Sequence, residues 1–481
     1  MLFIRNKSLS AGRKAENKNI AHITYAFVIL FIAMIAYIGY FTYFKAPDFI
    51  NSSYNSRQEL YAKKVVRGKI LSKDGEVLAE TVTNEDGSET RRYPCRNLFA
   101  HAVGYSTKGK TGVELLANFT LLTSDAFILD RIRNDLNGVK NIGDNVITTL
   151  DPAMQAAAYN ALGSYRGAVI AMDVKTGEIL CMVSKPDFDP NNIVQAWDEI
   201  NADTEQSALL NRVTNGLYPP GSTFKMVTLL EFIRENSDKE LEDYSYECNG
   251  SYSIDGFTIN CYHGVEHGDL NLKSAFSESC NSAFASIGVS LDKKAFQETC
   301  ETLLFNKKLP VKMSYRESYV PINENSDLGE VMQTAIGQGK TQATPLHIAM
   351  ITQAIANEGE LMKPYLIRRV ENWAGDTIKE YKPHSAGRIL EPGDALKLKA
   401  YLADTVENGT ATRLKSDLYS AAGKTGSAEY SKNKAMSHAW FTGFAPVEDP
   451  RVAVTVIAEE AGSGGLFAVP MAKAVFDAYF K

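Results

Sequence analysis

The sequence has few cysteines, six in 481 residues, and none of them forms a CxxC pair or lies beside histidines at zinc-site spacing. A disulfide-dense scaffold is therefore excluded, and neither a metal nor another cofactor is expected. The chain also lacks a basic excess, since its formal net charge is −6. It has no basic patch with interleaved aromatics, so nucleic-acid binding is not expected. No internal repeat or low-complexity tract is evident, which leaves an ordinary folded protein of two or three domains.

Charge is absent from one long hydrophobic run, residues 23–44. At 1.5 Å per residue, this run can span a hydrocarbon core of about 30 Å. It has no polar face, which a core helix would carry, and no cleavage site, which a signal peptide would carry. The basic residues before it predict a transmembrane anchor with a cytoplasmic tail at 1–22 and everything after Lys45 outside; they are Arg5, Lys7, Arg13, Lys14 and Lys18.

Residues 45–145 are polar and rich in short strand signals. Residues 68–71 and 76–78 flank a Lys73-Asp74-Gly75 turn and predict a hairpin. No stretch in this region places a serine, lysine or histidine beside a partner for catalysis. We interpret it as a non-catalytic, membrane-proximal pedestal of mixed structure that holds the next domain away from the membrane.

The second domain, residues 146–481, shows strand signals at both ends and helical signals between them. The predicted elements are a helix from Asp151-Pro152, strands 168–173 and 179–183, helical patterns in 224–305 and 346–356, strands 438–444 and 452–458, and a final helix from Pro470. Such an order predicts an α/β (α+β) fold in which distant parts of the chain close one antiparallel sheet. A separate helical lobe would fill the middle.

Ser222 and Lys225 form an S-x-x-K motif at the predicted start of a helix, after Pro219-Pro220-Gly221. Residues i and i+3 share a helix face, so Lys225 lies one turn from the Ser222 hydroxyl. A serine hydroxyl is a weak nucleophile that needs a base. A lysine can serve if burial or another cation lowers its pKa. Alone, the motif is common by chance, and Ser222 would then merely cap a helix.

Two more motifs follow along the chain. Ser279-Cys280-Asn281 offers a hydroxyl and an amide from a loop between helices, although alone it is more typical of a helix cap. Lys424-Thr425-Gly426-Ser427 indicates a strand on which Lys424 points into a cleft and Gly426 lets a substrate backbone approach. A chance strand edge is the alternative. A Walker A phosphate loop is excluded, because Leu418 stands where its first glycine would be.

Taken together, the order S-x-x-K, S-x-N, K-T-G resembles the penicillin-binding proteins, specifically their class B, monofunctional transpeptidases. The resemblance covers nearly the whole chain. It implies a transpeptidase domain of the β-lactamase-like type, with a five-stranded antiparallel sheet flanked by helices and an all-helical subdomain. Further segments that carry the resemblance are 66–71, 99–105, 112–114, 168–173, 337–339 and 344–346.

The resemblance implies a role for each nucleophilic or basic group of the first two motifs. Ser222 would attack the carbonyl between two D-alanines of a peptidoglycan stem peptide, and Lys225 would accept its proton. Ser279 and Asn281 would relay a proton to the leaving amine and bind the peptide.

The resemblance also implies that Lys424, Thr425 and Ser427 of the third motif bind the substrate's terminal carboxylate. Lys424 would also tune the pKa of Lys225. The backbone N–H groups of Ser222 and Ser427 would form the oxyanion hole. Many family members carry threonine where Ser427 stands, but the hydroxyl is retained.

The resemblance also implies partners and leaves alternatives open. β-Lactams would acylate Ser222, and a polytopic membrane glycosyltransferase would polymerise the glycan, because no such domain precedes residue 146. A D,D-carboxypeptidase would differ only in using water as acceptor. A β-lactamase would need a second base that is not found between Asn281 and Lys424, and a β-lactam sensor fits the single anchor poorly. Cys248 and Cys261 could form a disulfide outside the membrane or stay free.

Overall fold

The computed structural model describes residues 2–41, 64–429 and 437–481 and divides into two compact units, Met1–Tyr61 and Ala62–Lys481. The first unit holds one helix, α1 (Leu2–Tyr40). Within it, Ile20–Tyr40 is long and apolar enough to cross a membrane, and its side chains are exposed. This helix is compatible with a single-pass anchor. The last three residues of the predicted span, 42–44, lie outside the described residues.

The sheet of the second unit is built from both ends of the predicted catalytic domain. The expected five-stranded antiparallel sheet is confirmed, and its strand order is β17-β18-β19-β7-β8. The pairing of β19 with β7 joins the two ends, with Val454 opposite Ala171. The strands are β7 (Gly167–Asp173), β8 (Ile179–Lys185), β17 (Ala422–Glu429), β18 (Ser437–Ala445) and β19 (Val452–Ala458).

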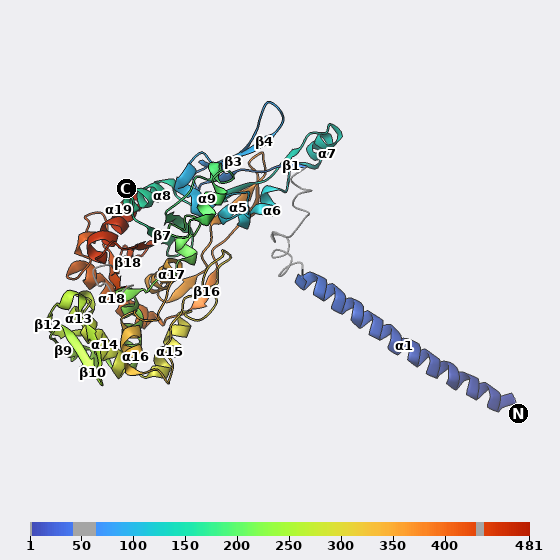
Figure 1. The fold of residues 1–481 in the computed structure, drawn as a ribbon. Helices are drawn as coiled ribbons and strands as arrows, with labels where there is room; N and C mark the ends of the chain where they lie inside the picture. Colours follow the sequence, from blue (N-terminus) through green and yellow to red (C-terminus); the bar gives the residue numbers. More distant parts are fainter. Residues whose placement is uncertain (1, 42–63, 430–436) are drawn as a thin grey trace. The chain divides into compact units, whose positions relative to one another are not determined.

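Both faces of this sheet are covered by helices, which explains why β7, β8 and β19 are largely apolar on both sides. Val169 and Ala171 pack in one core with α8 (Pro152–Leu162) and α19 (Val469–Phe480), two helices that lie side by side in Figure 1. The alternate residues Ala168 and Ile170 pack in a second core with α17 (Pro345–Ala356), all of whose residues are buried. The predicted start of α8 is confirmed, because the Asp151 side chain accepts a hydrogen bond from the N–H of Met154 at 3.0 Å.

The lobe in the middle of the chain is not helical throughout. Residues 245–271 form four short strands, where the sequence pattern predicted helix; they are β9 (Ser245–Cys248), β10 (Ser251–Ile254), β11 (Phe257–Asn260) and β12 (Gly268–Asn271). The hairpin β10–β11 turns at Asp255-Gly256, both with positive φ (47° and 80°). An Asp-Gly pair of this kind is a strong hairpin signal that the helical interpretation overlooked.

The rest of the lobe is helical, and Figure 1 shows it at the opposite end of this unit from β3 and β4. Its helices are α11 (Lys225–Glu235), α12 (Asp238–Glu242), α13 (Leu272–Ser277), α14 (Asn281–Ser290), α15 (Lys293–Thr302) and α16 (Leu328–Ala335). Further elements of the domain are α9 (Trp197–Ala202), α10 (Arg212–Asn215), α18 (Pro392–Glu407), β13 (Glu360–Met362) and β16 (Ser385–Arg388).

The N-terminal module forms a second sheet of order β15-β14-β6-β2-β3-β4. The predicted hairpin is its β2–β3 pair, with Ile70 opposite Ala79. Strands β14 (Ile367–Glu371) and β15 (Thr377–Glu380) come from far along the chain, within the predicted catalytic domain. The module's own elements are β1 (Val65–Val66), β2 (Ile70–Leu71), β3 (Val77–Thr83), β4 (Glu89–Arg92), β5 (Asn141–Ile142), β6 (Asn145–Thr148), α4 (Ala100–Val103), α5 (Gly112–Leu116), α6 (Asn118–Leu121) and α7 (Ile128–Leu136).

A buried carboxylate, Glu114, holds this module together. Its Oε2 accepts from Nε of Arg67 at 2.7 Å, and its Oε1 accepts from Nε of Arg91 at 2.8 Å and from the Tyr93 hydroxyl at 3.2 Å. Burial alone would raise the pKa of the Glu114 carboxyl, but the charges of Arg67 and Arg91 bring it below its usual value. The carboxylate is thus ionised and fully paired, and it joins two of the segments that carry the family resemblance.

We expect Glu114→Ala to lower the free energy of unfolding of the full-length protein by about 3–5 kcal/mol, because two buried guanidinium groups would lose their counterion. Chemical denaturation of purified protein measures this change. Glu85→Ala, at an exposed turn, is the matched control and should change stability by less than about 0.5 kcal/mol. Equal stability of the two variants would show that the buried pairs do not support the module.

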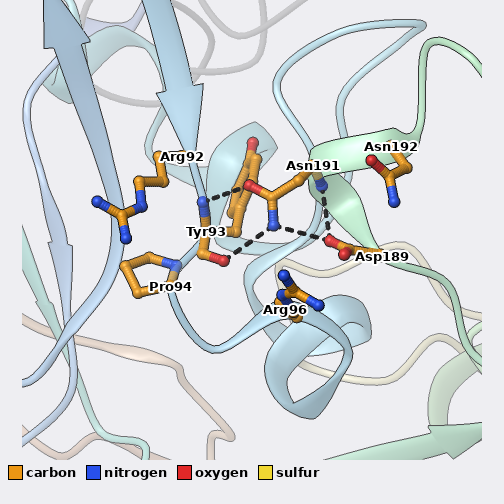
Figure 2. A pocket seen from close by; sticks show the side chains of 7 residues that line it. All are labelled: Arg92, Tyr93, Pro94, Arg96, Asp189, Asn191 and Asn192. Atoms are coloured by element: carbon orange, nitrogen blue, oxygen red, sulfur yellow. Dashed lines mark hydrogen bonds between the residues drawn. The ribbon is translucent and has the colours of Figure 1, made fainter.

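Asn191, in the 3₁₀ turn Pro190–Asn192, adds a further contact between the N-terminal module and the following part of the chain. Figure 2 shows its amide lying alongside the backbone of Tyr93. The Asn191 Oδ1 accepts from the Tyr93 N–H at 2.8 Å, and its Nδ2 donates to the Tyr93 carbonyl at 3.0 Å. Asp189 holds the amide in place by accepting from the same Nδ2 at 2.8 Å. The side chain thus pairs with the end of β4 as a neighbouring strand would, which fixes the two modules to each other.

Candidate active site

Ser222 lies in a 3₁₀ turn, Gly221–Phe224, that leads directly into α11. The helix was predicted to start near Ser222, and the structure makes its first turn 3₁₀. The Gly221 N–H donates to the Gly337 carbonyl at 2.9 Å. Gly337 has a φ of +68°, and a Cβ there would lie 2.2 Å from the Gly221 oxygen. Only glycine fits at position 337. The Gly337-Gln338-Gly339 segment, which carries part of the family resemblance, therefore supports the turn that presents Ser222.

Lys225 is fully buried one helical turn beyond Ser222. Its Nζ donates to the Ser279 carbonyl at 2.6 Å, to the Asn281 Oδ1 at 2.8 Å and to the Ser279 hydroxyl at 3.4 Å. Burial lowers the pKa of the Lys225 ammonium to about 8. The structure therefore brings the first two motifs together, with an amine that can lose its proton near neutral pH.

The second motif occupies the turn between α13 and α14. Ser279 has a φ of +63°, and Cys280 caps α14 by accepting from the Ala283 N–H at 3.4 Å. Asn281 uses its oxygen for Lys225, and its Nδ2 donates to the Asn260 carbonyl at 3.1 Å. The carboxamide is thus oriented from both ends, by Lys225 and by the end of β11.

The third motif lies on β17, the edge strand of the five-stranded sheet. Lys424 is fully buried, with its Nζ 5.4 Å from the centre of the Phe276 ring. Burial, together with the positive charge of Lys225, lowers the pKa of the Lys424 ammonium well below its usual value. Two amines in one water-poor site disfavour each other's charge, so the site holds fewer protons than two exposed lysines would.

The polar groups that follow Lys424 are held in place by neighbours from other segments. The Thr425 hydroxyl lies 2.5 Å from that of Thr410, and the Ser427 hydroxyl accepts from the Gly464 N–H at 3.2 Å. A Cβ on Gly426 would lie 3.1 Å from the Trp440 Cβ and 3.2 Å from the Pro220 carbonyl. Gly426 therefore lets the strand pack tightly against the segment that carries Ser222.

A cleft of about 920 Å³ opens over these groups. Six of the predicted site residues line it: Ser222, Ser279, Asn281, Thr425, Gly426 and Ser427. Lys225 and Lys424 are buried behind its surface. Other residues that line the cleft were not predicted from the sequence, among them Thr410, Asn260, Tyr262 and His267. None of them belongs to a motif, so only the fold could place them here.

Two family descriptions match the chain. The penicillin binding protein transpeptidase domain matches residues 167–477, and the penicillin binding protein A dimerisation domain matches residues 67–146. The first covers more than half of the chain and contains all three motifs. The chain belongs to the class B penicillin-binding proteins.

Relatives of this penicillin-binding protein extend over almost its full length. The peptidoglycan D,D-transpeptidase PbpA of Mycolicibacterium smegmatis is 30% identical over 96% of this chain and 99% of its own. MrdA of Acinetobacter baumannii, also a peptidoglycan D,D-transpeptidase, is 26% identical over 81% of this chain and 66% of its own. Penicillin-binding protein A from M. tuberculosis, solved as an acyl-enzyme with a cephalosporin, superposes with a TM-score of 0.80 at 28% identity and covers 88% of this chain and 100% of its own.

A disulfide between Cys248 and Cys261 was one of two alternatives left open by the sequence of this penicillin-binding protein. In the structure their Sγ atoms lie 3.7 Å apart, and all six cysteines are free thiols. Sequence spacing also gave no sign of a group of side chains that lie close together in the structure. Cys248, Cys261, His267 and Cys280 come together with ligand atoms within 4.8 Å of one another, because strand pairing joins residues that no spacing rule connects.

Proposed function

We propose that this protein is a peptidoglycan D,D-transpeptidase that cross-links stem peptides through an acyl-enzyme on Ser222. The observation that carries the proposal is the burial of Lys225 one turn from Ser222, with its Nζ held by Ser279 and Asn281. A buried amine with a lowered pKa is the base that a serine nucleophile needs.

In the first half-reaction, the Ser222 Oγ attacks the carbonyl carbon between two D-alanines while its proton passes to the Lys225 Nζ. The backbone N–H groups of Ser222 and Ser427 stabilise the oxyanion, a contribution of about 3–4 kcal/mol per donor. The C–N bond then breaks as the leaving amine takes a proton through the Ser279 hydroxyl. D-Alanine leaves, and the rest of the peptide stays on Ser222 as an ester.

In the second half-reaction, an amine of a neighbouring peptide attacks this ester and restores Ser222. Asn281 orients the peptide backbone with its amide. Lys424, Thr425 and Ser427 bind the terminal carboxylate of the donor, the group that a β-lactam also presents. The M. tuberculosis relative forms acyl-enzymes with several β-lactams, which supports covalent inhibition of this chain at Ser222.

The apolar helix α1 supports membrane anchoring of this enzyme. The basic residues before it favour a cytoplasmic N-terminus and an extracytoplasmic catalytic domain. The matched descriptions name a transpeptidase and a dimerisation domain. A polytopic membrane glycosyltransferase is accordingly proposed to supply the glycan strands.

Full-length protein in detergent, incubated with a polymerase and a lipid-linked disaccharide pentapeptide, should produce cross-linked dimers of muropeptides. Penicillin should block them. Release of D-alanine without dimers would contradict transpeptidation and favour the carboxypeptidase alternative. Rapid turnover of penicillin would instead indicate a β-lactamase. The matched control is Ser222→Ala in the same assay, which isolates this chain's contribution from that of the polymerase.

A further inference from the structure

One helix of the N-terminal module, α7, carries its apolar side chains on the outside. None of its residues, all of which the structure describes, is buried. Its hydrophobic residues recur at helical spacing and form one stripe, in which each side chain is between 49% and 82% exposed; they are Ile128, Leu129, Ile132 and Leu136. A surface helix of a globular protein normally turns such a stripe toward the core. An exposed stripe therefore indicates that something outside the chain covers it.

The contacts that attach α7 to the module are polar. The Asn134 Nδ2 donates to the Asn141 Oδ1 at 3.0 Å, and the Asn141 Nδ2 donates to the Asp135 Oδ1 at 3.2 Å. Asn141 is buried and belongs to β5. Within α7, Asp130 and Asn134 are half-buried, whereas the apolar side chains are exposed. The helix thus turns a polar side toward the module and its apolar stripe outward.

The exposed apolar surface continues on both sides of α7 and includes a tryptophan from a distant part of the chain. Trp373, which is 50% exposed, lies in the turn between β14 and β15. This turn is next to the start of β6, because the Asn145 Nδ2 donates to the Asn372 carbonyl at 3.5 Å. Tryptophan favours the interface between membrane and water. Three further exposed apolar residues precede or follow α7 in sequence: Phe127, Val139 and Ile142.

The same end of the module receives the chain from the apolar helix α1. This helix ends at Tyr40, and the first strand described after it is β1. Strand β1 pairs in parallel with β5, with Val65 opposite Asn141, the residue that holds α7. The apolar stripe therefore lies beside the strand at which the chain enters the module.

Basic groups border the apolar stripe on both sides. Arg131 and Arg133 are exposed, and the helical repeat places one on each flank of the stripe. Arginines in such positions keep their charge among lipid phosphates while their stems cover apolar surface. Of the two acidic groups of α7, Asp130 is half-buried and Asp135 accepts from Asn141. An anionic lipid surface therefore complements this face of the helix.

We propose that α7 lies in the interface of the membrane that α1 anchors, with its apolar stripe inserted among anionic phospholipids. The N-terminal module then rests on the bilayer. In Figure 1 the helical lobe, which forms one wall of the cleft, lies at the opposite end of this unit from α7. Contact through α7 would thus hold this wall away from the lipid. The proposal rests on the proposed membrane anchor and not on transpeptidation.

Quenching of tryptophan fluorescence by brominated lipid tests the contact in full-length protein. The protein is reconstituted in vesicles of phosphatidylglycerol and phosphatidylcholine, with or without bromine on the acyl chains. A Trp373→Phe parent removes the exposed native indole. Leu136→Trp in this parent should lose about half of its added emission to bromine, because an interfacial helix lies about 5–10 Å deep. Leu396→Trp, which replaces an exposed leucine of α18, is the matched control and should keep its added emission.

A charge placed in the stripe tests whether insertion depends on its apolar character. Ile132→Asp, combined with Leu136→Trp, should abolish the quenching, because a carboxylate opposes insertion into lipid. Ile132 is exposed, so the midpoint of chemical denaturation should stay that of the parent. An unchanged midpoint separates loss of membrane contact from loss of the fold.

Flotation of the vesicles separates failure of the anchor from failure of α7. A protein that stays in solution would overturn both the anchor and this proposal. A protein that floats, but whose Leu136→Trp emission ignores bromine or is quenched no more than that of Leu396→Trp, would overturn the contact of α7 alone. Disulfide-linked dimers of Leu136→Cys would then assign the stripe to a second copy of the chain.

Discussion

Ser222→Ala should lose covalent labelling by fluorescent penicillin, with a fall in acylation on the order of 10⁴-fold or more, because the variant lacks the atom that forms the ester. Ser222 faces the cleft from a turn whose position depends on Gly221 and Gly337, not on the serine hydroxyl. The free energy of unfolding should therefore stay within about 0.5 kcal/mol of wild type. Gel fluorescence and chemical denaturation of the same preparation measure both quantities.

The matched control is Ser463→Ala, which removes another serine hydroxyl from the wall of the same cleft. This variant should label as wild type does, since Ser463 belongs to none of the three motifs. If Ser222→Ala still forms a stable adduct, a different nucleophile must be sought. Peptide mapping of the adduct would then locate it among the other hydroxyl groups of the cleft.

The sequence predicted correctly those parts of the fold in which the local hydrophobic pattern matches the burial of the residues in the structure. Strands β7 and β8 are apolar at most positions because helices cover both faces of the sheet, and the Lys175-Thr176-Gly177 turn separates them in the sequence. Asp151 followed by Pro152 predicted the start of α8, because an aspartate side chain can cap the N-terminus of a helix. Strand signals at both ends of the domain predicted that distant parts of the chain close one antiparallel sheet, and the pairing of β19 with β7 is where they meet.

The segment 245–271 was misjudged because its strands are short and half exposed. Polar and apolar residues alternate there without a buried face, and these strands pack against α14. The catalytic motifs could be found because each is contiguous in sequence. The cluster of Cys248, Cys261, His267 and Cys280 could not, since its spacing is set by the pairing of β9 with β12.

A second prediction with a large expected effect concerns Lys225. Only the neutral amine can accept the Ser222 proton, and burial lowers its pKa to about 8. Above this pKa the amine is free, so the acylation rate of wild type should rise with pH through about 8 and then level off. Stopped-flow measurement of acylation by a chromogenic β-lactam between pH 6 and 10 gives this profile.

Lys225→Gln should slow acylation about 10²–10⁴-fold at every pH and remove the rise near pH 8. Glutamine has no basic nitrogen, and its side chain is one bond shorter than that of Lys225, whose Nζ contacts the Asn281 Oδ1 at 2.8 Å and the Ser279 carbonyl at 2.6 Å. Loss of the pH-dependent rise in this variant therefore reports the missing base, whereas the size of the rate loss also includes the loss of these contacts. Lys340→Ala, which removes an exposed lysine paired with Glu330, should leave the profile unchanged. A pH-dependent rise that survives in Lys225→Gln would assign the proton transfer to another group, and Lys424, with its strongly lowered pKa, is the amine to test next.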